Sequence, residues 1–125
     1  MALKVLLDEN LPHTLRRHLA HHDTMTAAYA GFAGYKNGAL LDAAEAGGFD
    51  VLLTGDGTLH YEQNMKRRKI ALVSLSAVSW PVIEPHVERI VAAVDAAVPG
   101  SFTRVDCGVF VRPGGRSNPG DPERD

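Results

Sequence analysis

Cysteine is almost absent from this chain of 125 residues, in which Cys107 is the only one. A single cysteine excludes an intramolecular disulfide, and it also excludes the paired cysteines of zinc knuckles and thioredoxin-like redox sites. A chain of this length buries roughly two-thirds of its unfolded surface, so one core is stable without such staples. We therefore expect one globular domain from a reducing compartment, the cytoplasm.

Long apolar runs are also absent. No stretch of 18 apolar residues occurs, and Asp8 and Glu9 interrupt the first apolar segment before it reaches the length of a signal-peptide core. The sequence therefore predicts neither secretion nor a membrane span.

The chain has no strong excess of charge of either sign. Lys and Arg number 13 against 15 Asp and Glu, for a net charge of −2, which argues against a broad basic surface for nucleic acid but leaves room for a small local one. Residues 113–125 are rich in Pro, Gly and polar residues and carry two Arg against three acids. We expect this segment to be a disordered tail after a single domain at residues 1–112.

The chain does contain an alternation of short apolar runs and helical patterns, which is typical of an α/β domain with a mainly parallel sheet. The predicted fold has three layers, α/β/α, around four or five strands. Strands are expected at residues 4–7, 23–26, 51–54 and 70–75, helices from Pro12 onward, at 37–45 and at 82–97, and one or two short strands at 102–105 and 109–111. Whether the last segments form an antiparallel edge, with a hairpin at 106–108, stays open.

Acidic residues follow two of the predicted strands. Asp8 and Glu9 come directly after the first, and Asp56 follows the third within Gly55-Asp56-Gly57. Because functional groups of open parallel sheets gather beyond the carboxyl ends of the strands, these carboxylates are expected to converge and to hold a Mg²⁺ or Mn²⁺ ion. The alternative is that Asp8 caps the next helix and Asp56 occupies a turn.

Three segments carry a family resemblance. Residues 6–12 read Leu-Leu-Asp-Glu-Asn-Leu-Pro, residues 34–41 read Gly-Tyr-Lys-Asn-Gly-Ala-Leu-Leu, and residues 53–56 read Leu-Thr-Gly-Asp, followed by Leu59 and by Gln63-Asn64. Over residues 3–105 the chain resembles the PIN-like domains of the DUF5615 family, relatives of the toxin ribonucleases of bacterial toxin–antitoxin pairs. The resemblance implies a short doubly wound fold and metal-dependent hydrolysis of RNA.

The resemblance also implies a metal site. Asp8 and Asp56 would bind Mg²⁺ or Mn²⁺, which activates a water and offsets the charge on the leaving oxygen, and Glu9 would bind a second ion or a water. Two positions depart from the family pattern, because Thr58 and Asn37 stand where acids are usual, with Asp42 the next acid along. Asn37 can still bind the ion through its carbonyl oxygen, but it adds no charge.

Polar and basic residues near these acids are candidates for contact with RNA. The basic run 66–69 lies close to Asp56 in the sequence, although such a run is often only a solvated face. The candidate substrate-binding residues are Asn10, Lys36, Thr54, Thr58, Tyr61, Gln63, Asn64, Arg67 and Arg68.

Two other functions remain open. The reduced set of acids is compatible with a catalytically silent PIN-like module that binds a protein or RNA. A phosphoacceptor receiver domain would also place an acidic pair after its first strand and an Asp after its third, but it needs a late lysine, and none follows Lys69. RNA, a cognate antitoxin and a second copy of the chain are the expected partners.

Two histidines have a spacing that suits a metal. His18 and His22 stand four residues apart, as zinc ligands on one helix can, but no cysteine or third ligand lies nearby in the sequence. We therefore expect them to be solvated histidines at a helix end.

Overall fold

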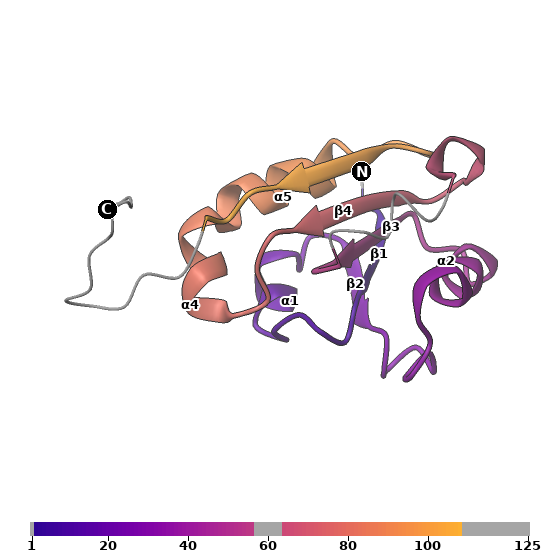
Figure 1. Ribbon diagram of the computed structural model, residues 1–125, viewed down its shortest axis with the longest axis horizontal. Helices are drawn as coiled ribbons and strands as arrows, with labels where there is room; N and C mark the ends of the chain where they lie inside the picture. The colour runs from indigo at the N-terminus through magenta and orange to yellow at the C-terminus, as the bar shows by residue number, and fades with distance from the viewer. Residues whose placement is uncertain (1, 57–63, 109–125) are drawn as a thin grey trace.

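The computed structural model describes residues 2–56 and 64–108, which form an α/β domain around a five-stranded sheet (Figure 1). All strand pairs are parallel, and the strand order is β2-β1-β3-β4-β5. The strands are β1 (Lys4–Leu7), β2 (Asp23–Thr26), β3 (Val51–Thr54), β4 (Ala71–Leu75) and β5 (Phe102–Val105). The predicted α/β class with a parallel central sheet is confirmed, and the undecided segment 102–105 is a parallel edge strand beside β4.

The central strands are mostly apolar because helices cover both faces of the sheet. Successive side chains point to opposite faces, so Leu6, Leu52 and Leu72, which are register neighbours, all pack on the face of α2 (Asn37–Ala46). The residues that alternate with them, such as Leu7 and its neighbour Leu53, pack on the opposite face. The molecule therefore has two apolar clusters with the sheet between them.

The second face is covered by α1 (Leu15–His18), α4 (Trp80–Ile83) and α5 (Val87–Asp95), which lie apart from α2 in Figure 1. Leu11, Leu15 and Leu19 are all buried there, as their four-residue spacing predicts. The single helix expected at 82–97 is wrong in its continuity, because a 3₁₀ turn, η2 (Glu84–His86), separates α4 from α5. Pro85 explains the break, since its ring removes an N–H and clashes with the preceding turn.

Two stretches at the end of the chain need comment. The expected hairpin at 106–108 and strand at 109–111 lie partly outside the described residues, and residues 106–108 are irregular. The predicted tail at 113–125 lies wholly outside them. Among the described helices, none has the length and apolar character needed to cross a membrane.

The order of the strands determines where a site can form. The chain goes from β1 outward to β2 and then crosses to the other side of β1 to form β3. This reversal opens a crevice beyond the carboxyl ends of β1 and β3, where ligands of open α/β sheets bind.

Candidate active site at the carboxyl ends of β1 and β3

Three acidic side chains line one pocket beyond the carboxyl ends of β1 and β3. Asp8 and Glu9 follow β1 directly, and Asp56 comes two residues after β3. The pocket has a volume of about 270 Å³ and is lined by Asp8, Glu9, Asn10, Gly34, Tyr35, Lys36, Leu40 and Asp56. The expected convergence of the acids is therefore seen in the structure. Asp8 does not cap α1, whose N-cap position is Thr14.

Thr54 joins the two strand ends through a single hydroxyl. Its Oγ1 donates a hydrogen bond to Oδ2 of Asp8 at 2.6 Å and accepts one from the backbone N–H of Asp56 at 3.1 Å. The side chain is fully buried, so it lies behind the carboxylates and not on the surface that a substrate would meet. The sequence-based expectation that Thr54 contacts substrate is better replaced by a positioning role.

Further hydrogen bonds hold the loops around the pocket. Oδ1 of Asp8 accepts the N–H of Glu9 at 2.7 Å, and Oε2 of Glu9 accepts the N–H of Gly34 at 2.7 Å, which ties the β1 loop to the segment before α2. Oδ1 of Asn10 accepts the N–H of Gly55 at 3.3 Å. Asn10 thus supports the loop after β3.

The donor set suits a hard divalent cation. Asp8 uses each carboxylate oxygen in one hydrogen bond, which leaves further lone pairs on both, and Glu9 and Asp56 bring two more carboxylates to the same pocket. Carboxylate oxygens are the ligands that Mg²⁺ and Mn²⁺ prefer. Asn37 begins α2 beside Lys36, but its side chain lies outside the described part of the structure.

Lys36 is the basic residue that the structure brings to the carboxylates, since it lines the same pocket. A cation at that position can contact a phosphate that approaches the acids. Thr58, Tyr61 and Gln63, the other polar candidates of this region, lie outside the described residues, as does His60.

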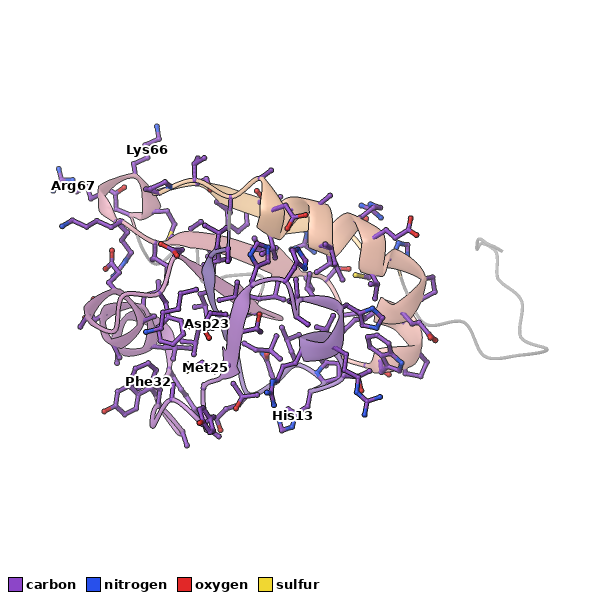
Figure 2. The ribbon with its side chains drawn as sticks, turned by 180° about the vertical axis from the view of Figure 1, so that it is seen from behind. His13, Asp23, Met25, Phe32, Lys66 and Arg67 are labelled. Carbon is purple, nitrogen blue, oxygen red and sulfur yellow. The ribbon has the colours of Figure 1, made fainter. Side chains whose placement is uncertain are left out.

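The basic run lies at the other edge of the sheet. Asn64, Arg67 and Arg68 belong to or flank η1 (Met65–Arg67), which precedes the amino end of β4, whereas the acids follow carboxyl ends. In Figure 2, Lys66 and Arg67 lie at the upper edge, and β2 runs from Asp23 to Met25 away from them. Closeness to Asp56 in the sequence therefore does not make these residues neighbours of the pocket.

Arg68 has structural partners. Its Nη1 forms ion pairs with Asp42 at 2.9 Å and with Glu45 at 2.7 Å, which connect η1 to α2. Asp42 is consequently engaged away from the pocket and does not replace the acid expected at position 37.

Sequence reasoning gave no specific role to two residues around the site. Ser74 in β4 donates a hydrogen bond from Oγ to the carbonyl oxygen of Asp56 at 3.2 Å, and it is fully buried. A polar residue within an otherwise apolar buried strand is the signal that could have identified it. Gly55 is the second case, because a Cβ at that position would collide with Val78, so the loops after β3 and β4 approach closely only with glycine there.

Comparison of the chain with protein-family models, with curated proteins and with solved structures yields no match. The resemblance to the DUF5615 family thus stays a prediction based on residues 6–12, 34–41 and 53–56.

Proposed function

We propose that this protein is a metal-dependent endoribonuclease of PIN-like type that hydrolyses RNA phosphodiester bonds. The observation that carries the proposal is the pocket itself, in which Asp8 and Asp56 are linked through the buried Thr54 hydroxyl, with Glu9 and Lys36 in the same wall. Carboxylates gathered in one pocket repel one another unless a cation or a proton lies between them.

The residues have separable tasks in this proposal. Asp8, Asp56 and Glu9 would hold Mg²⁺ or Mn²⁺, with Asn37 as a further oxygen ligand. When bound, the ion supplies an activated water and stabilises the charge that develops on the phosphate oxygens. Lys36 would contact the substrate phosphate, and Thr54 would keep the Asp8 carboxylate oriented, because its hydroxyl proton is committed to Oδ2.

Cleavage of RNA with each ion tests the proposal directly. Purified full-length protein is incubated with a mixture of labelled single-stranded and structured RNAs in Mg²⁺, in Mn²⁺ and in EDTA. We expect cleavage with either ion and none in EDTA. Asp8→Asn and Asp56→Asn should each reduce the rate at least about 100-fold, since removing one group that stabilises transition-state charge typically has an effect of this size.

Asp42→Asn is the matched control, because it removes one carboxylate that pairs with Arg68 outside the pocket. Cleavage that Asp8→Asn leaves unchanged would refute the proposed site. If no RNA is cleaved with either ion but RNA or a protein still binds, the protein is a silent module. A role as the toxin of a toxin–antitoxin pair further predicts growth arrest on expression that Asp56→Asn relieves, and a small adjacent antitoxin gene.

The strand order favours a second candidate, the phosphoacceptor receiver. The order β2-β1-β3-β4-β5, with an acidic pair after β1 and Asp56 after β3, is one that flavodoxin-like folds use. Against it, β5 is followed by Asp106, whose pKa is lowered chiefly by the hydrogen bond from the Gly108 backbone N–H. An anion there would repel a phosphoryl group. Incorporation of phosphate at Asp56 from a small phosphodonor would establish the receiver function and exclude the nuclease as the primary one.

A further inference from the structure

A second cluster of metal-ligating side chains lies at the amino edge of the sheet, away from the carboxylate pocket. His21 and His22 precede β2, and Asp95 is the last residue of α5. The Nε2 atoms of both histidines approach the same oxygen, Oδ1 of Asp95, at 2.8 Å from His21 and 2.6 Å from His22. The three ligand atoms all lie within 4.8 Å of one another.

One side chain of the cluster is buried and the other two are partly exposed to solvent. The side chain of His22 is only 2% exposed, which contradicts the expectation of a solvated histidine, whereas His21 and Asp95 are 50% and 49% exposed. His18, the other histidine of the sequence-based pair, instead stacks on Trp80 with ring centroids 5.5 Å apart. The third ligand that the sequence did not reveal is Asp95, which is 73 residues from His22 along the chain.

We propose that His21, His22 and Asp95 bind a borderline transition-metal ion, with Zn²⁺ as the reference ion. Two imidazole nitrogens and one carboxylate oxygen form a donor set that Zn²⁺ takes in open sites, where a solvent molecule completes the tetrahedron. The open side faces solvent beside His21 and Asp95. The site differs in chemistry from the all-oxygen pocket at Asp8 and does not depend on the proposed ribonuclease function.

Zinc binding requires small changes in the cluster. Ligand atoms of a tetrahedral zinc site lie about 3.3 Å apart for bonds of about 2.0 Å, so the hydrogen-bonded atoms must separate by roughly 0.5 to 0.7 Å. His21 and Asp95 are exposed enough to move. The anionic form of the Asp95 carboxylate is already favoured, since the hydrogen bonds from His21 and then from His22 lower the pKa of Asp95.

The hydrogen bonds of His22 define a diagnostic step. Its Nδ1 accepts the backbone N–H of Leu3 at 2.9 Å, so without an ion the ring proton is on Nε2, which donates it to Asp95. Binding through Nε2 moves this proton to Nδ1 by way of solvent and breaks the hydrogen bond from Leu3. The ring remains neutral, and the tautomer reverses. Loss of that bond also limits the affinity, because bound histidines normally donate their second N–H to an acceptor.

Calorimetric titration with ZnCl₂ tests the proposal, using untagged full-length protein that has been stripped with EDTA and dialysed. We expect one saturable site per chain. His21→Ala and Asp95→Asn should each weaken binding at least about 10-fold, because even an outer partner of a metal ligand typically contributes that much. In ¹⁵N spectra of the imidazoles, zinc should convert His22 from the Nε2-protonated to the Nδ1-protonated form.

Two control variants separate this site from others. His18→Ala removes the histidine that ends α1, which lies outside the cluster, and Asp8→Asn disables the carboxylate pocket, so both should retain zinc binding. Asp95→Asn lies at a half-exposed position and serves as the test if His21→Ala fails to fold. The proposal is overturned by an absence of saturable zinc binding, by equal binding in Asp95→Asn and the unaltered protein, or by an unchanged His22 tautomer.

Discussion

The two edges of one parallel sheet carry two different sets of ligands. At the carboxyl edge, Asp8, Glu9 and Asp56 supply only oxygen atoms, whereas at the amino edge His21, His22 and Asp95 supply two nitrogens and one oxygen. Strands of four residues place these edges only roughly 13 Å apart. Our two proposals thus assign a different cation chemistry to each edge, since hard ions prefer carboxylates and borderline ions prefer imidazole.

The two edges also differ in how their ligands are supported. The carboxylates belong to residues within two positions of a strand end, and the buried hydroxyl of Thr54 links the Asp8 carboxylate to the backbone N–H of Asp56. The second cluster depends on α5, which must pack on the sheet before Asp95 can reach the histidines. The first set is therefore built from the sheet itself and the second from the docking of a helix.

The largest expected effect comes from disturbing that docking. Ile90 is a fully buried residue of α5, and Ile90→Ala should lower the free energy of unfolding by about 2–5 kcal/mol through lost burial and the cavity left behind. Urea unfolding followed by circular dichroism measures the change. Val98→Ala, at a position 58% exposed, is the control and should have little effect. Similar stabilities for both variants would show that α5 does not pack as described.

Thr54→Val breaks the link at the carboxyl edge with little change in shape. It removes the donor to Asp8 and the acceptor for the Asp56 N–H, so we expect a loss of about 1–3 kcal/mol in unfolding free energy. Ribonuclease activity should fall as well, while zinc binding at the other edge remains. Ser76→Ala, in the loop after β4, is a matched loss of one hydroxyl. An unaltered rate of RNA cleavage in Thr54→Val would contradict its positioning role.

A comparison of two single-charge changes tests which edge meets RNA. Lys36→Gln removes the cation of the carboxylate pocket, and Arg67→Gln removes an exposed cation of η1 at the opposite edge. If one phosphate contact is lost, the slope of log affinity against log salt for single-stranded RNA should decrease by about 0.7. We expect this decrease for Lys36→Gln only. The reverse result would place the RNA path along the basic run.

The smallest expected effect concerns the decrease of the unfolding free energy at acidic pH. The folded-state pKa of Asp95 is lowered, chiefly by the hydrogen bond from His21 and then by that from His22. Its contribution to stability is therefore present above the ordinary aspartate pKa of 3.8 and is lost as the pH falls through the lower pKa of the folded state. Asp95→Asn should therefore flatten the loss of unfolding free energy below that pH. Urea midpoints measured from about pH 5 to about pH 2.5 give the slope.

Glu88→Gln, a neutralisation on the same helix, is the control for Asp95→Asn. If both variants lose unfolding free energy with falling pH as steeply as the unaltered protein, the histidine hydrogen bonds do not stabilise the Asp95 anion.

Much of the fold was predictable because its signals are local. The strands at 4–7, 23–26, 51–54 and 102–105 have their predicted bounds, and α2 extends the predicted range by one residue. A strand that is buried on both faces needs apolar side chains on both, so it is visible in the sequence as a continuous apolar run. The prediction of a continuous helix at 82–97 was wrong because it followed the periodic apolar positions and did not take account of Pro85.

The sites were predictable only in part. Residues that directly follow strands share an edge in any parallel sheet, so Asp8 and Asp56 were expected to meet, and they do line one pocket. The position of the basic run was not predictable, because Arg68 is 12 positions after Asp56 and the chain reaches the opposite edge of the sheet within that distance. Sequence distance carries no information about such a crossing.

The sequence by itself determined the absence of covalent staples, the parallel α/β class and the acids at two strand ends, because composition and local periodicity are properties of neighbouring residues. Only the tertiary structure decided that Thr54 links those acids, that Arg68 pairs with Asp42 and Glu45, and that Asp95 meets His21 and His22. These contacts join residues that are between 23 and 74 positions apart, apart from the Thr54–Asp56 bond. These contacts form only when the helices pack on the sheet and the strands pair in their final order.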